Sequence, residues 1–187
     1  KDLLNFDTYG FDDLWTVYHS KKDKNIRYDF GLELTLRDIN ISPEQVREKQ
    51  FVKERQVKDG LKYLLDKDGN QVLDSRGNKV QVDKMVKVSC ELYQFTQYKS
   101  AEVVGQVKYT DFNSQQLLKT FPIKSKFVFE HVYASFNGDK RALEDSFLGM
   151  TRLRAVKFPT NEQMVFDAGN DLKRNLKGII SNNKFRN

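Results

Sequence analysis

Three oxygen-bearing side chains at alternate positions are the first residues in this sequence that could do chemistry. Asp66, Asp68 and Asn70 offer carboxylate and amide oxygens, and Ca²⁺ prefers oxygen ligands of this kind. The calcium loop of an EF-hand also needs a glutamate at its twelfth position, but counting from Asp66 places Gly77 there. The motif is incomplete, and calcium binding is one of two interpretations of these residues.

The second interpretation is that these residues form turns, because they belong to a short internal repeat. Residues 66–72 (DKDGNQV) are followed, eight positions on, by residues 74–80 (DSRGNKV). Each Gly-Asn pair can supply the positive-φ positions of a tight turn. Two units are too few for a solenoid. The sequence therefore predicts two tandem turns, and calcium is kept as the alternative.

The candidate nucleophile and bases lie far apart in the sequence. Cys90 is the only cysteine, which excludes an intramolecular disulfide, a zinc site built from cysteines and a paired redox motif. It lies in an alternating apolar row, residues 86–92, which predicts a buried thiol. The chain offers only His19 and His131 as partners, and neither has a local metal-binding spacing. For His131, between strand aromatics, we expect a structural role rather than general-base catalysis.

Motifs for nucleotide and hydrolase chemistry are missing. The sequence has no Walker-type or dinucleotide-binding glycine pattern, and Gly-x-Ser-x-Gly is also absent. Pairs of carboxylates, as in glycosidases, could still meet across a sheet. The sequence assigns no catalytic, cofactor-binding or metal-ligating residue and no cofactor, and we expect a chain that is not an enzyme.

Composition predicts one folded domain over residues 1–187, with a ragged polar C-terminus from about residue 181. A chain of 187 residues with 39% hydrophobic residues, including 14 Phe and 8 Tyr, can bury a substantial core. The net charge of +6 is a weak indicator of nucleic acid, since residues 44–62 mix both signs as a solvated face does. Basic residues do alternate with Tyr and Phe in residues 93–109 and 121–133, which keeps a nucleic-acid-binding sheet face as an alternative.

The apolar pattern predicts a mainly antiparallel sheet. Residues 26–36 alternate as a half-buried strand, and the phase changes after Asp38, which predicts a bulge or a strand end. In the first part of the chain we expect strand-like residues 14–18, a cap at Ser42-Pro43-Glu44, and a helix or polar edge strand over 45–58. Further on we expect a hairpin of residues 85–97 and 101–111 joined by 98–100, with a close neighbour at Gly105. A turn at 111–114 and a central strand over 123–135 should follow.

The C-terminal region predicts a helix that closes the sheet. Pro159 breaks the chain, Thr160 can cap, and Gln163 completes a capping-box pattern. An apolar stripe then recurs every four residues at Met164, Ala168, Leu172, Leu176 and Ile180. A short helix is expected after Gly138-Asp139. The predicted fold class is α+β, a mainly antiparallel β-sheet packed against a C-terminal amphipathic helix, with one or two short helices.

Three segments resemble uncharacterised exported envelope proteins of the Bacteroidota, of the lipoprotein type. They are residues 121–131 (FPIKSKFVFEH), 138–143 (GDKRAL) and 158–169 (FPTNEQMVFDAG). The resemblance covers about the second two-thirds of the chain and implies export to the periplasm or cell envelope. It also implies a lipid anchor upstream of Lys1, and it transfers no catalytic residue. At the level of fold alone, the pattern is similar to periplasmic lipoprotein domains that regulate cell-wall enzymes.

The start of the chain does not by itself indicate a compartment. No stretch reaches the about 18 to 20 apolar residues of a membrane span, and no signal peptide is visible. The sequence opens at Lys1 rather than Met, which suggests a processed or trimmed chain. We therefore expect a non-enzymatic envelope domain that binds a protein partner or an envelope polymer. The alternatives are a nucleic-acid-binding domain and an unrecognised hydrolase.

Overall fold

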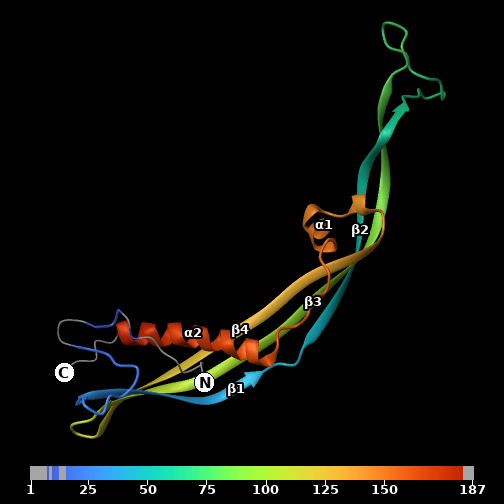
Figure 1. Ribbon diagram of the computed structural model, residues 1–187. Helices are drawn as coiled ribbons and strands as arrows, with labels where there is room; N and C mark the ends of the chain where they lie inside the picture. Colours follow the sequence, from blue (N-terminus) through green and yellow to red (C-terminus); the bar gives the residue numbers. More distant parts are fainter. Residues whose placement is uncertain (1–7, 9, 13–15, 183–187) are drawn as a thin grey trace. The chain divides into compact units, whose positions relative to one another are not determined.

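The computed structural model describes residues 8, 10–12 and 16–182. Within them, the sheet is mainly antiparallel and few residues are helical, so the α+β class with a C-terminal helix is confirmed. The elements of this described part (Figure 1) are β1 (Phe30–Ile41), β2 (Gln45–Tyr63), β3 (Gln81–Asp111), β4 (Gln116–Gly138), the 3-10 helix η2 (Lys140–Ala142), α1 (Asp145–Thr151) and α2 (Asn161–Asn182).

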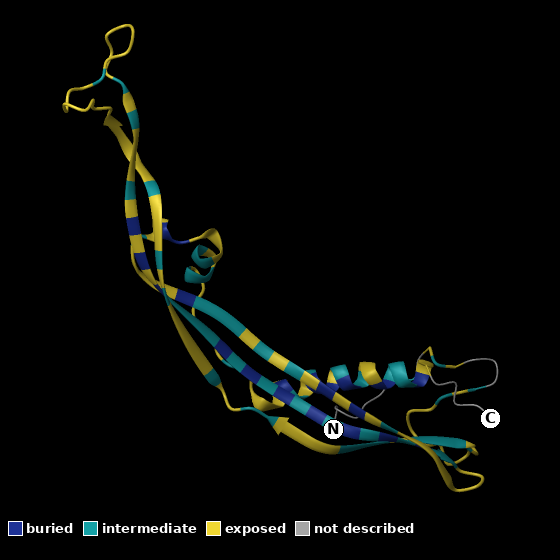
Figure 2. Cartoon of the chain, turned by 180° about the vertical axis from the view of Figure 1, so that it is seen from behind, coloured by how far each residue is buried: buried dark blue, intermediate teal, exposed yellow. Residues whose placement is uncertain are grey.

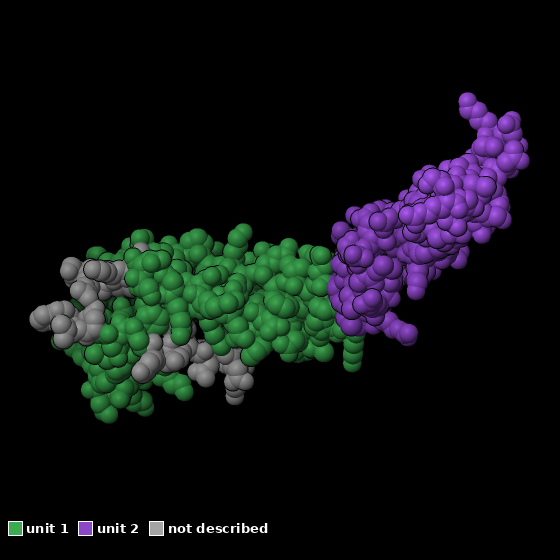
Figure 3. Space-filling model, turned by 90° about the horizontal axis from the view of Figure 1, so that it is seen from above, with its two compact units in different colours: residues 1–45, 98–130, 157–187 green, residues 46–97, 131–156 purple. Residues whose placement is uncertain are grey.

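The chain divides into two compact units, which Figure 3 shows in different colours. Unit 1 consists of residues 1–45, 98–130 and 157–187, and unit 2 consists of residues 46–97 and 131–156. Each unit is built from separate stretches of the chain, because β3 and β4 contribute residues to both. The single domain expected over residues 1–187 stays a prediction, and the end of the chain beyond residue 182 lies outside the described residues.

In unit 1, β3 is the middle strand and β1 and β4 pair with it. β1 runs antiparallel to β3, with Phe30 opposite Asp111 and Ile41 opposite Ala101. The register shifts between Leu36 and Asp38, which confirms the predicted bulge. The prediction of a central strand over 123–135 is wrong, because β4 pairs only with β3 among the described strands. Large side chains on both faces of these residues predicted burial on both sides. On the face away from α2, however, Val128 is 42% exposed.

The core of unit 1 lies between the sheet and α2. Alternate residues of β3 point toward the helix, as strand geometry requires. All five positions of the predicted helical stripe are buried (Figure 2). The buried core cluster consists of Val103, Val107, Tyr109, Ile123, Ala168, Leu172, Leu176 and Ile180.

The predicted cap of α2 is half confirmed. The backbone N–H of Gln163 donates to Thr160 Oγ1 at 3.2 Å, as a capping residue requires. The Gln163 side chain does not return to the cap and instead donates to Asp167 Oδ2 at 3.0 Å. A charged acceptor one turn along the helix makes the stronger hydrogen bond.

The hairpin predicted across residues 98–100 is wrong, because β3 runs without a break from Gln81 to Asp111. Lys99 was read as part of a polar turn, but its side chain is 3% exposed. Its ammonium group donates to Glu44 Oε1 at 3.1 Å and to the Pro159 carbonyl at 2.7 Å. A polar strand residue whose donors are satisfied can be buried, so the chain has no need to turn.

The helix cap predicted at Ser42 is also wrong. Of the two alternatives for residues 45–58, a helix or a polar edge strand, the strand is correct, because they lie in β2, which ends the strand order beside β3. Ser42 Oγ accepts the backbone N–H of Ser100 at 2.9 Å, and the Ser42 N–H donates to the Ser100 carbonyl at 2.8 Å. The close neighbour predicted at Gly105 is confirmed, since a Cβ there would lie 2.7 Å from the carbonyl oxygen of Thr35.

Unit 2 contains β2, the first part of β3, the end of β4, η2 and α1. A second core cluster joins the sheet to the short helices, with Val88, Cys90, Leu92, Ala134, Ala142 and Leu143 buried. Exposed side chains of the same two strands form ion pairs. Lys58 pairs with Asp83 at 2.6 Å and Lys87 pairs with Glu54 at 2.7 Å, and both pairs link β2 to β3.

The short helix expected after Gly138 is confirmed as η2, since Asp139 Oδ1 accepts the Arg141 N–H at 2.9 Å. The turn predicted at 111–114 is also confirmed, because Asp111 Oδ1 accepts the N–H groups of Asn113 and Ser114. Of the strand-like residues 14–18, residues 16–18 are not in a strand, and residues 14–15 lie outside the described part. No helix in residues 16–182 is long and apolar enough to cross a membrane.

The buried Lys99 gives a test of this fold. Replacing it as Lys99→Met keeps the aliphatic stem but removes the donors to Glu44 and Pro159, so we expect the free energy of unfolding to fall by about 1–3 kcal/mol. Urea denaturation of both chains measures it. The matched control Lys124→Met, at an exposed position of β4, should change stability by less than about 0.5 kcal/mol. Equal losses from the two variants would contradict the anchoring role of Lys99.

Candidate functional site

The end of the β2–β3 pair is held by a closed ring of main-chain hydrogen bonds. Leu64 N donates to Val80 O, Val72 N donates to Leu64 O, and Val80 N donates to Val72 O, each at 2.9 Å. The three positions are eight residues apart, which is the period of the internal repeat. The ring ties the two loops of the repeat to the end of the strands (Figure 1). We call residues 61–80 the ribbon tip.

Each loop of the ribbon tip is built around an aspartate. Asp66 Oδ1 accepts the N–H groups of Asp68 and Asn70 at 3.0 and 2.8 Å. In the second loop, Asp74 Oδ1 accepts the N–H groups of residues 76 and 78, both at 2.8 Å. The glycines of the two loops have φ values of 87° and 81°, a region that only glycine adopts without strain. The two predicted turns are confirmed.

The same hydrogen bonds account for the residues that suggested calcium. Asp66 Oδ2 also faces the Asn70 side-chain amide, at 3.5 Å, so both carboxylate oxygens face donors of their own loop. Hydrogen bonds from Asn70 lower the pKa of Asp66 most, and those from Asn78 do the same for the pKa of Asp74. Among residues 16–182, no three His, Cys, Asp or Glu side chains gather as metal ligands. The loop geometry therefore favours turns over the calcium alternative.

Large apolar side chains of the ribbon tip are exposed to solvent. Leu65 and Leu73 are 55% and 56% exposed, and neither belongs to a core cluster. Figure 2 shows that most of this segment is exposed. Leu61, Tyr63 and Leu64 are exposed as well. Leu65 and Leu73 lie outside both core clusters, so they are available for contact with another molecule.

Basic side chains outnumber acidic ones in the ribbon tip. The ribbon tip carries Lys62, Lys67, Arg76 and Lys79 against three aspartates. The carboxylates of Asp66 and Asp74 are engaged inside their loops, as described above. The Lys79 ammonium group lies 5.5 Å from the centre of the Tyr63 ring. We call these four basic side chains the cationic rim; together with the three aspartates, they give the ribbon tip a formal net charge of +1.

Both histidines have structural partners inside their own units. His131 Nε2 lies 2.8 Å from the Arg154 carbonyl oxygen, and its ring stacks on Tyr133. His19 Nδ1 lies 2.7 Å from Tyr28 Oη. Within the described part of the chain, neither histidine is hydrogen-bonded to a carboxylate or a nucleophile. Cys90 is buried as predicted, and this burial is the main cause that raises the pKa of its thiol.

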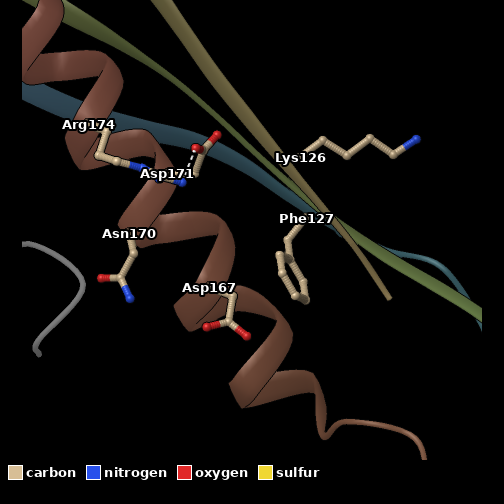
Figure 4. Close-up of a pocket in the computed structure, with 6 residues that line it drawn as sticks. All are labelled: Lys126, Phe127, Asp167, Asn170, Asp171 and Arg174. Atoms are coloured by element: carbon tan, nitrogen blue, oxygen red, sulfur yellow. Dashed lines mark hydrogen bonds and ion pairs between the residues drawn. The ribbon is translucent and has the colours of Figure 1, made fainter. Parts of the chain in front are cut away.

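An open pocket of about 630 Å³ lies between β4 and α2 in unit 1 (Figure 4). It contains two carboxylates one turn apart, Asp167 and Asp171, which is the arrangement that a hydrolase alternative would need. Asp171 already accepts Ser125 Oγ at 2.8 Å and Arg174 Nη2 at 2.6 Å. Asp167 accepts the Gln163 side chain. Both carboxylates therefore accept hydrogen bonds from side chains of α2, and Asp171 also links the helix to β4 through Ser125.

The basic and aromatic residues that suggested nucleic acid are separated by the pleat of the strand. In β4, Phe121 and Phe127 pack against the core beneath α2. Lys124 and Lys126 alternate with them and are exposed. In unit 2, Phe95 and Tyr133 stack on each other with ring centres 5.0 Å apart. A base would need open ring faces beside cations. Lys124 and Lys126 lie on the face of β4 opposite to Phe121 and Phe127 because strand side chains alternate, whereas the Lys119 ammonium group lies 4.8 Å from the centre of the Phe121 ring.

Comparison of the chain with protein-family models, curated proteins and solved structures finds no match. The resemblance to envelope proteins therefore stays a prediction. The apolar ribbon tip is the part of the site that sequence reasoning missed. The turn motif was visible in the sequence, but no local pattern there distinguishes exposed leucines at positions 65 and 73 from buried ones.

The loops of the ribbon tip predict a specific pH dependence. Their hydrogen bonds favour the ionised form of Asp66 and Asp74, so the stabilisation is complete above about pH 4, the ordinary range of an aspartate pKa. It is lost as the pH falls through the lowered pKa of the folded state. NMR chemical shifts of the Asn70 and Asn78 amides should therefore change only below about pH 4. In Asp66→Ala, the Asn70 amide should lose this titration and the Asn78 amide should keep it. A midpoint above pH 4 in the original chain would contradict the loop geometry.

Proposed function

We propose that this chain is a non-enzymatic exported domain of the cell envelope that binds a protein partner through the ribbon tip. The observation that carries the proposal is the set of exposed leucines on a backbone fixed by the ring of Leu64, Val72 and Val80. A rigid presenting element loses little conformational entropy on binding. In this proposal α2 is an amphipathic helix whose role is to close the core of unit 1.

A protein partner fits the ribbon tip better than an envelope polymer does. Burial of a leucine that was exposed contributes up to about 1.5–3 kcal/mol, and an apolar protein pocket can bury Leu65 and Leu73 fully. A hydrated polymer offers little apolar surface to these side chains. The aromatic ring at the tip, Tyr63, has Lys79 near its face.

The cationic rim defines the chemistry of that partner. Lys62, Lys67 and Arg76 favour an apolar pocket whose border is acidic, since complementary charge speeds association and excludes wrong partners. A lipid surface is the less favoured target, because Asp66 and Asp74 lie beside the leucines and their lowered pKa values keep them charged. The periplasmic or envelope location rests on the resemblance of residues 121–169.

Site-specific photo-crosslinking tests the proposed contact. A photoreactive residue at position 73 should form an adduct with one protein in envelope preparations, whereas the same residue at position 124, an exposed site in unit 1, should not. Mass spectrometry then identifies the adduct, and binding is measured with the purified partner. Identical adducts from both positions would show that the ribbon tip is not the contact.

With the purified partner, the double variant Leu65→Ser, Leu73→Ser should bind about tenfold more weakly or worse, equivalent to about 1.4 kcal/mol. Its thermal unfolding should match that of the original chain, because both side chains are exposed and outside the core clusters. Calorimetry checks affinity and fold together. Unchanged affinity would contradict the proposal. Binding to anionic vesicles that is lost in the same variant would instead support a lipid surface and overturn the protein partner.

A further inference from the structure

A cleft of about 840 Å³ lies in unit 1, and it is separate from the pocket of Figure 4 and from the ribbon tip. One side consists of the apolar face of the sheet, with Leu32 and Leu34 from β1 and Val107 from β3. Leu176 and Ile180 of α2 line it from the helix. Its volume falls in the range of about 300–1,000 Å³ that small-molecule sites occupy.

The cleft lies along the part of the apolar sheet face that β1 contributes. Leu34 lies directly opposite Val107, and Leu32 lies opposite Tyr109. Each pair shares one face of the sheet. Val107 and Tyr109 are buried, but Leu32 and Leu34 are only partly buried. The β1 side of the core therefore keeps an apolar surface that a ligand can cover.

Two cations line the same cleft and have neutral partners. The Lys22 ammonium group lies 5.7 Å from the centre of the Phe112 ring. Arg27 Nη2 donates to Asn113 Oδ1 at 2.8 Å. Among the residues that the structure describes, no carboxylate lies within ion-pair distance of Lys22 or Arg27. Both cations can therefore pair with an anionic group.

Three further polar side chains of the cleft, Asp29, His19 and Tyr28, are hydrogen-bonded within unit 1. Asp29 also lines the cleft, and Asp29 Oδ1 accepts the Asn113 side-chain amide at 3.2 Å. His19 is hydrogen-bonded to Tyr28, whose hydroxyl also accepts the Asp23 N–H at 3.0 Å. An apolar surface with cations nearby is the chemistry that binds an amphipathic anion.

We propose that this cleft binds a long-chain carboxylate such as a fatty acid. The hydrocarbon chain lies along Leu32, Leu34 and Leu176, and the carboxylate pairs with Lys22 and Arg27. A neutral apolar ligand would leave both cations without an anion. A sugar or nucleotide would place hydroxyl groups against the leucines, where they would lack hydrogen-bond partners. The proposal is independent of the ribbon tip.

The experiment is a fluorescence titration of the full chain with a dansyl-labelled long-chain fatty acid. We expect saturable binding with a Kd on the order of micromolar, and competition by unlabelled palmitate. Hexadecanol, which has the same chain length without the charge, should compete about tenfold more weakly. Leu34→Trp, which fills the cleft, should weaken binding of the probe by about tenfold or more.

Charge variants test the anionic end separately. Lys22→Glu should lower the affinity for palmitate by about tenfold and leave that for hexadecanol nearly unchanged. The control Lys124→Glu makes the same charge change at an exposed site of β4 and should leave both affinities unchanged. Circular dichroism melting establishes that each variant folds, and Leu32→Trp replaces Leu34→Trp if the latter does not.

Three results would overturn the proposal. One is the absence of saturable binding, and another is binding that neither tryptophan variant weakens. The third is equal competition by palmitate and hexadecanol, which would remove the role of Lys22 and Arg27. None of these results affects the crosslinking test at position 73, so failure of the cleft and failure of the ribbon tip are distinguishable.

Discussion

The buried ammonium group of Lys99 joins three segments of unit 1 that are distant in sequence. It contacts Glu44, at the start of β2, and the Pro159 carbonyl, just before α2 begins. Burial of an unpaired charge is costly. The Lys99 ammonium group can therefore be buried only while Glu44 and the Pro159 carbonyl lie beside it. The contact therefore positions the start of α2 against β3, and from there Met164 and the later apolar residues of the helix reach the sheet.

Strand β3, which continues through Lys99 without a break, also determines which side chains the sheet of unit 1 exposes. In unit 1, alternate residues of β3 face the helix, so the aromatic side chains of the neighbouring β4 lie on that face too. Lysines at the alternate positions are left on the open face. Lys124 and Lys126 are thus separated from Phe121 and Phe127, while Lys119 lies against the ring of Phe121. In this part of β4, the alternation reduces the pairing of cations with open rings that a nucleic-acid interface needs.

The two surfaces proposed for binding arise from opposite physical causes. At the ribbon tip, backbone and aspartate hydrogen bonds satisfy the loops without any packed core, so Leu65 and Leu73 stay exposed. In the cleft, Leu32 and Leu34 of β1 pack against the core of unit 1 but stay partly exposed. Both surfaces are apolar areas with cations beside them, and each belongs to a single unit.

Local interactions were predictable from the sequence by itself: the bulge near Asp38, the loops of Asp66 and Asp74, and the Thr160 cap depend on residues close together along the chain. The tertiary structure decided the rest. Residues 98–100 continue a strand only because Glu44 and Pro159 supply partners for Lys99, and β4 became an outer strand because β3 pairs on both sides. Exposure of Leu65 and Leu73 was equally hidden, since burial depends on contacts between distant residues and a local pattern of apolar residues does not contain them.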